Sequence, residues 1–255
     1  MISPTPPVFP PAITQGAASA DPAIVLVCEH ASNALPDAFG TLGLSETERQ
    51  AHVAWDPGAL GVAQALQRLL RGDLVAGTVS RLLYDCNRPP EAESAYPDRS
   101  EVFDIPGNRD LSAEAKAARV AAIYQPFGNA VDRVMKVRGQ GVLVTVHSFT
   151  PVYHGQPRSF EIGVLHDDDS RLADLMLQDW PADAPLRAER NVPYGPEDGV
   201  THTLRKHGIA KGWPNVMLEI RNDLIATQAQ QQAVARLIAD RLRAALLQLK
   251  VNSDD

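Results

Sequence analysis

The sequence predicts an α/β fold, a three-layer domain with a mostly parallel or mixed sheet. Short β-branched apolar runs recur along its 255 residues, and polar turns and segments with helical spacing of apolar side chains follow them. Alternation of this kind is typical of a sheet with helices packed on its faces. The first run, residues 24–28, is apolar throughout, as expected for a strand buried on both faces.

The predicted elements follow this alternation in order. The predicted strands span residues 24–28, 74–80, 142–146, 161–165 and 215–220. Helical spacing covers residues 45–71, 112–138 and the segment that follows Thr227. Ser45 and Thr227 each begin a capping-box pattern, Pro57 should interrupt the first helical region, and Pro126 should kink the second.

Residues 1–22 differ from the rest in composition. They hold six of the 20 prolines and no basic side chain. We expect a Pro-rich leader that is extended along the surface or mobile. The remaining residues, 23–255, are predicted to form a single domain, because this length suits one medium-sized core and no internal boundary stands out.

Composition excludes several classes of protein. The chain has 24 basic and 31 acidic side chains, a formal net charge of −7, whereas nucleic-acid binding requires clustered basic charge. The longest strongly apolar runs, 24–28 and 142–146, are far shorter than the roughly 20 residues that span a bilayer. Two cysteines cannot form a disulfide framework. We expect a cytoplasmic protein that binds neither nucleic acid nor membrane.

Polar clusters directly follow three predicted strands, at 29–33, 147–148 and 221–223. In open α/β sheets ligands bind at the carboxyl ends of the strands. His30 and His147 are the natural pair of metal ligands, and Asp56, in an irregular turn, is the strongest third candidate. Glu29 and Asn33 are weaker ones. The alternative is that both histidines are buried structural residues and Asp56 is a helix cap.

Glu219 is a carboxylate within an apolar strand, and burial raises a carboxyl pKa toward the range that suits a general base. A structural salt bridge is the alternative interpretation. Arg88 lies in a loop stiffened by two prolines, and Arg81 and Arg221 are further cations for an anionic substrate. For each arginine, the alternative is a solvated surface side chain.

The order of these motifs resembles the N-formylglutamate amidohydrolase family. The segments that carry the resemblance are Glu29-His30-Ala31-Ser32-Asn33, Trp55-Asp56-Pro57-Gly58, Ser80-Arg81, Asp85-Cys86-Asn87-Arg88-Pro89, His147-Ser148 and Glu219-Ile220-Arg221. The family's fold is similar to the zinc-dependent exopeptidases and to the aspartoacylase group. The resemblance implies hydrolysis of the amide bond of a small anionic N-acyl amino acid such as N-formylglutamate.

The resemblance also implies roles for individual residues. His30, Asp56 and His147 would hold one Zn²⁺ per chain, and Glu219 would act as the general base. Arg81 is the catalytic candidate among the arginines, but the sequence leaves open whether Arg81 or Arg88 stabilises the developing oxyanion and which of them holds a substrate carboxylate. The implied substrate-binding residues are Asn87, Arg88, Arg221, Ser148 and Asn33.

Two positions depart from the pattern of related enzymes. The first cluster is Glu-His-Ala-Ser-Asn where better-known deformylases have Pro-His-Ala-Gly. Asn33 stands where the exopeptidases have a metal-binding glutamate, and an amide is a poor zinc ligand. Two other functions therefore stay open: a zinc carboxypeptidase-like peptidase or other N-acyl amino acid deacylase, and a non-catalytic dicarboxylate-binding protein.

Overall fold

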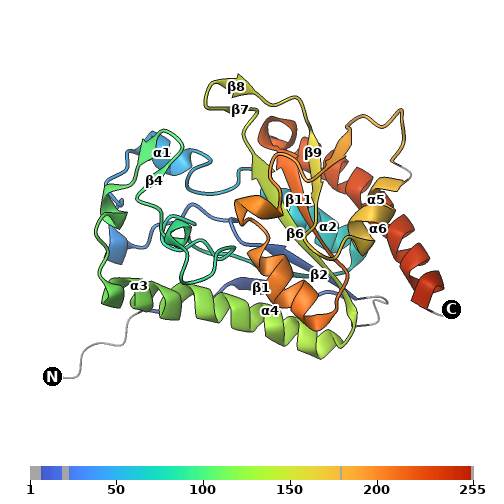
Figure 1. The fold of residues 1–255 in the computed structure, drawn as a ribbon, viewed down its shortest axis with the longest axis horizontal. Helices are drawn as coiled ribbons and strands as arrows, with labels where there is room; N and C mark the ends of the chain where they lie inside the picture. The colour runs from blue at the N-terminus through green and yellow to red at the C-terminus, as the bar shows by residue number, and fades with distance from the viewer. Residues whose placement is uncertain (1–6, 19–22, 179, 254–255) are drawn as a thin grey trace.

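A seven-stranded sheet forms the centre of the computed structural model, which describes residues 7–18, 23–178 and 180–253. The strand order is β1-β3-β2-β6-β11-β9-β10 (Figure 1). These strands are β1 (Ala12–Thr14), β2 (Ala23–Cys28), β3 (Asp73–Ala76), β6 (Gly141–Phe149), β9 (Ile162–Leu165), β10 (Ala188–Arg190) and β11 (Asn215–Arg221). Each of the five strands predicted from the sequence is present.

The sheet is mixed, with a parallel centre. Strands β3, β2, β6 and β11 run parallel to one another, whereas β1 and β9 pair antiparallel with their neighbours β3 and β11. The carboxyl ends of the four central strands therefore meet at one edge of the sheet, where loops can converge without disturbing the core. The predicted α/β class is confirmed.

Helices cover both faces of the sheet (Figure 1). Alternate residues of β2 point to opposite faces: Leu26 packs in the same buried cluster as residues of α2 and α6, while Val25 and Val27 pack with residues of α4. This alternation makes three layers. The helices are α1 (Glu46–Gln50), α2 (Ala59–Leu70), α3 (Ala113–Arg119), α4 (Gln125–Arg138), α5 (Arg171–Gln178) and α6 (Gln228–Ser253).

Local signals in the sequence explain where several helices begin and bend. Ser45 and Thr227 both form the predicted capping boxes. In the second helical region, a π-helical turn, Val120–Tyr124, joins α3 to α4 two residues before Pro126, where a kink was predicted. Because proline has no N–H to donate, a wider turn accommodates it without breaking the helix.

Short elements complete the chain. Two hairpins, β4 (Arg99–Ser100) with β5 (Phe103–Asp104) and β7 (Val152–Tyr153) with β8 (Gln156–Pro157), lie outside the main sheet. The 3₁₀ turns are Asp37–Phe39, Glu93–Ala95, Pro106–Asn108, Pro196–Asp198, Ile209–Lys211 and Asn222–Ile225, and a second π-helical turn is Leu204–Gly208. In the described part of the chain, no helix has the length and apolarity needed to cross a bilayer.

Part of the predicted leader belongs to the sheet. Residues 12–14 form the edge strand β1, and the nearby backbone is also fixed, because the Phe9 N–H donates to the Ala122 carbonyl and the Thr78 hydroxyl to the Pro10 carbonyl. The described residues of the leader thus lie extended against the body of the protein. Residues 1–6 and 19–22 fall outside the described residues, and the single-domain assignment stays a prediction.

Candidate active site

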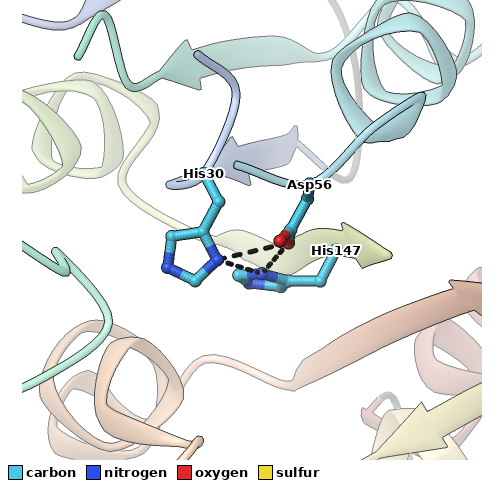
Figure 2. Close-up of side chains that lie close together, drawn as sticks. All are labelled: His30, Asp56 and His147. Carbon is cyan, nitrogen blue, oxygen red and sulfur yellow. Dashed lines mark hydrogen bonds and ion pairs between the residues drawn. The ribbon is translucent and has the colours of Figure 1, made fainter. Parts of the chain in front are cut away.

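The three predicted metal ligands come together from three different segments (Figure 2). His30 follows the end of β2, Asp56 occupies the turn between α1 and α2, and His147 lies on β6. The Asp56 N–H donates to the His30 carbonyl over 2.9 Å, which attaches the turn to the end of β2. Since β2 and β6 are parallel neighbours, both imidazoles emerge at the same edge of the sheet.

The ligand atoms form a small triangle. His30 Nδ1 lies 3.2 Å and His147 Nδ1 lies 3.0 Å from Asp56 Oδ2, and the two nitrogens are 3.2 Å apart. Metal–ligand bonds of about 2.0–2.1 Å in a tetrahedral zinc site place neighbouring ligand atoms about 3.3 Å apart. The separations observed here are close to that spacing. All three residues are buried, with at most 3% of each exposed.

A second carboxylate faces the far nitrogen of each imidazole. His30 Nε2 lies 2.7 Å from Asp85 Oδ1, and His147 Nε2 lies 3.1 Å from Glu29 Oε2. The Asp85 carboxylate accepts a hydrogen bond from His30 Nε2, and the Glu29 charge beside His147 Nε2 also favours a proton on that nitrogen. With the proton on Nε2, each Nδ1 can direct a lone pair at the triangle. Three electron-rich atoms in contact repel one another unless a cation lies among them. The donor set therefore fits a divalent metal ion, and zinc suits two imidazoles and a carboxylate.

The surrounding charges favour a cation as well. Burial by itself would raise the pKa of Asp56, but the His30 and His147 imidazoles hold it well below its ordinary value. Burial opposes protonation of His147, yet the Glu29 and Asp56 carboxylates outweigh it and raise the pKa of that imidazole. The site thus keeps its carboxylates ionised and stabilises positive charge at its centre.

Arg81 connects two of these carboxylates. Its Nη1 donates to Asp56 Oδ1 over 3.3 Å and its Nη2 to Asp85 Oδ2 over 2.8 Å. The side chain is 23% exposed and borders the cavity described below. Arg81 therefore orients Asp56 and Asp85 with part of its guanidinium, and the rest of that group faces the cavity.

Glu219 stands beside the triangle. It lies on β11 directly opposite His147 in the parallel register, so both side chains project from the same face of the sheet. Burial raises the pKa of Glu219 to about 7. Its Oε2 atom is buried and has no hydrogen-bond partner among the described residues. No structural salt bridge within that part of the chain engages this carboxylate, which is the alternative that the sequence left open.

One cavity of about 210 Å³ joins these groups. Its lining comes from the carboxyl ends of β6 and β11, from the turn before α2, and from the loops and hairpins around them. The lining residues are His30, His52, Val53, Asp56, Arg81, Asn87, Arg88, Ser100, Glu101, His147, Ser148, Tyr153, Tyr194, Val200, Met217 and Glu219.

Three predicted substrate-binding residues line this cavity, and they differ in how many of their polar atoms are already hydrogen-bonded within the protein. The Asn87 amide is occupied on both sides, donating to the Val200 carbonyl and accepting from the Thr203 N–H, so it holds the 200–203 segment in place. The Ser148 hydroxyl donates to the Pro57 carbonyl. Arg88 donates only to a backbone carbonyl, and no carboxylate of the described residues lies within ion-pair distance of it.

Two other predicted substrate-binding residues lie outside the cavity lining. Asn33 donates to the Arg49 carbonyl and to the Gln50 side chain, because the chain turns toward α1 after His30. Arg221 is the last residue of β11 and is drawn toward Asp223, with which it forms an ion pair at 2.8 Å. Both side chains are engaged away from the cavity lining, and their role in substrate binding stays a prediction.

Several residues at the site were not assigned these roles from the sequence. Asp85 had no individual role there, and Glu29 was considered only as a metal ligand. The signal for both was present, since each metal-binding histidine needs an acceptor for its other N–H, and both acids lie in the polar motifs. His52, whose Nδ1 lies 3.6 Å from Asp56 Oδ1, and the cavity residues Tyr153 and Tyr194 carry no comparable pattern.

Comparison with known proteins places this geometry in context. A family model described as N-formylglutamate amidohydrolase matches residues 23–226. The structure of a gene product from Agrobacterium tumefaciens is similar, with 50% sequence identity, a TM-score of 0.91, and coverage of 95% of this chain and 96% of that one. An N-formylglutamate amidohydrolase from Ralstonia eutropha shares the fold, with 19% identity, a TM-score of 0.61, and coverage of 93% and 97%. No curated protein matches the sequence.

Proposed function

This chain belongs to the N-formylglutamate amidohydrolase family, and we propose that it hydrolyses the amide bond of an N-acyl acidic amino acid such as N-formylglutamate. We place the reaction in the cytoplasm, with one zinc ion per chain. The observation that carries the proposal is the convergence of a His30–Asp56–His147 triangle with Glu219 on one small cavity.

His30, Asp56 and His147 would hold the ion. Zinc bound there would polarise the amide carbonyl and acidify a water molecule. The protein's own contribution is to keep the two imidazoles in the tautomer that can bind, through Glu29 and Asp85, and to fix the Asp56 carboxylate through Arg81 and the Ser148 N–H.

Glu219 is the proposed general base. Glu219 lines the cavity beside His147, and one of its carboxylate oxygens has no hydrogen-bond partner among the described residues. Glu219 accepts a proton from that water as the new C–O bond forms, and it returns the proton to the nitrogen as the C–N bond breaks. With N-formylglutamate the products are formate and glutamate, and water supplies the atoms that balance the reaction.

The cationic side chains divide the remaining work. The part of Arg81 that faces the cavity is proposed to stabilise the negative charge on the carbonyl oxygen in the transition state. Arg88, which has no acidic partner in the described structure, is proposed to bind the α-carboxylate of the substrate. Asn87 keeps the 200–203 segment against the cavity, and Ser148 contributes to the wall.

An assay of the purified protein with elemental analysis tests this proposal. We expect about one zinc ion per chain and a kcat/KM that is higher for N-formylglutamate than for N-acetylglutamate, N-succinylglutamate or dipeptides. A chelator should abolish turnover, and added zinc should restore it. The His147→Ala variant should lose zinc, whereas His166→Ala, a matched control outside the lining, should keep it.

Each competing function gives a different result. Faster cleavage of dipeptides would indicate a peptidase, and preference for another acyl group would indicate a different deacylase. A metal-free protein that binds glutamate without hydrolysing any of these amides would be a dicarboxylate-binding protein.

A further inference from the structure

The arginines around the cavity differ in their partners. Arg81 forms ion pairs with Asp56 and Asp85. Arg88 and Arg158 have no carboxylate within 4.0 Å among the described residues. A half-buried guanidinium without a counter-ion is costly, because burial removes water and the neutral acceptors around Arg88 and Arg158 do not balance the charge. Two such groups beside one small cavity suggest that the ligand supplies the missing negative charges.

Arg158 is not itself in the cavity lining, but it contacts two side chains of the cavity wall. Its Cζ atom is 4.4 Å from the centroid of the Tyr153 ring and 5.2 Å from that of Tyr194, and both of these tyrosines line the cavity. The ring of Phe149 lies on a further side at 5.5 Å. The three rings attract the cation and restrict its orientation, but they do not neutralise it.

Tyr194 links Arg158 to the cavity. Arg158 Nη2 donates to the Tyr194 hydroxyl oxygen over 3.2 Å, which leaves the O–H of the phenol to donate to another acceptor. Burial and the nearby Glu219 carboxylate raise the pKa of Tyr194, so its hydroxyl stays protonated near neutral pH. A carboxylate at this wall would receive hydrogen bonds from the phenol and from the guanidinium behind it.

The backbone at Arg158 is held independently of its guanidinium. Its N–H donates to the Pro151 carbonyl over 2.8 Å, and its carbonyl accepts from Arg221 Nη1 over 3.2 Å. The position is therefore fixed before any ligand binds, and replacement of the side chain leaves both of these backbone contacts in place.

We propose that Arg158 and Tyr194 form a second anion subsite, which binds the side-chain carboxylate of the substrate while Arg88 binds the α-carboxylate. This inference rests on the proposed function. It makes Arg158 the residue that distinguishes an acidic N-acyl amino acid from its neutral amide, since both present the same shape to the rest of the cavity.

The test compares two substrates that differ only in the side-chain carboxylate, N-formyl-L-glutamate and N-formyl-L-glutamine. For Arg158→Gln in the zinc-loaded enzyme, we expect kcat/KM to fall by roughly 10- to 150-fold on the glutamate substrate, as for loss of one charged hydrogen bond. On the glutamine substrate we expect less than about a threefold change. Tyr194→Phe should show the same selectivity with a smaller loss, and Arg158→Lys should recover part of it.

Arg190→Gln is the matched control, because it removes an arginine whose partner is Asp174 and which is outside the lining. Equal losses on both substrates with Arg158→Gln would overturn the inference and leave Arg158 a structural role. A preference for the glutamate substrate that survives the substitution would also overturn it.

Calorimetry with L-glutamate and L-glutamine separates this inference from the proposed function, since it requires no turnover. Tighter binding of glutamate to the wild type, reduced to the level of glutamine in Arg158→Gln, supports the subsite even if no amide is cleaved. Equal binding of the two amino acids to the wild type overturns it, whatever the enzyme hydrolyses.

Discussion

The two halves of the cavity are built differently. The metal-binding half, His30, Asp56 and His147, is almost fully buried, and carboxylates neutralise or orient each of its groups. The other part holds Arg88, and Arg158 contacts its Tyr153 and Tyr194 walls; both arginines are half-buried loop side chains without an acidic partner in the described structure. The first half directs electron-rich atoms at a site for a cation, and the second leaves positive charge for an anionic ligand.

This difference indicates that one set of residues carries out the reaction and another set selects the substrate. Groups that must hold a metal and move a proton need fixed positions, and two of the ligands and Glu219 come from the ends of paired strands or from the strands themselves. Groups that select a substrate can lie on hairpins and loops, provided that their backbone is held. Substitutions in the first half should change metal content or turnover, and those in the second should change selectivity.

Glu219→Gln should have the largest effect on turnover while leaving the metal in place. The substitution removes the proton acceptor but keeps the size of the side chain. We expect kcat to fall by about 10²–10⁴, as for loss of a general base, with zinc content unchanged. Steady-state kinetics with elemental analysis measure both quantities, and Glu189→Gln on β10 is the exposed control. Near-full activity would end the assignment of Glu219.

Asp85→Asn should weaken the metal half without altering its ligands. The carboxylate that accepts from His30 Nε2 becomes neutral, so the imidazole is a poorer donor to the ion and Arg81 loses one ion pair. Zinc affinity should fall by about 10- to 100-fold, the usual effect of losing such a partner. Competition with a chromophoric chelator measures it, with Asp110→Asn as the control. Unchanged affinity would mean that Asp85 does not support His30.

Asn33→Ala should have the smallest effect. This side chain contacts Arg49 and Gln50 and not the cavity, so kcat/KM should stay within about twofold of the wild type. The free energy of unfolding should fall by about 1 kcal/mol or less, because only exposed or partly buried hydrogen bonds are lost. Thermal unfolding and steady-state kinetics check both expectations. A loss of activity with the stability intact would return Asn33 to the substrate site.

Much of the architecture could be predicted because it depends on local patterns. The apolar run of β2, the capping box at Ser45 and the polar residues that follow strands are all visible within a few positions of the chain. His30 and His147 were found for that reason. The π-helical turn before Pro126 was not, since proline predicts a disturbance of the helix but not its form.

The partners of these residues depend on contacts between distant segments. His30 contacts Asp85, which is 55 positions away in the sequence, and His147 contacts Glu29, which follows a neighbouring strand. No local pattern predicts which carboxylate lies beside which imidazole. The same holds for Asn33 and Arg221, which follow strands as the site residues do but turn away. The position of a polar residue after a strand predicts at which edge of the sheet it lies. That position does not predict the direction in which its side chain points.

The sequence by itself determined the α/β class, the order of the strands along the chain, and the two histidines and the strand-borne glutamate that meet at one edge. Those features follow from hydrophobic periodicity and from the polarity of strand ends, which are properties of short segments. Only the tertiary structure decided which acids orient the imidazoles, which arginines keep a free charge, and where the loops leave room. The pairing of these charged groups depends on how side chains from distant segments pack together in one buried region. In such a region a charged group either forms an ion pair within the protein or stays available to bind a ligand.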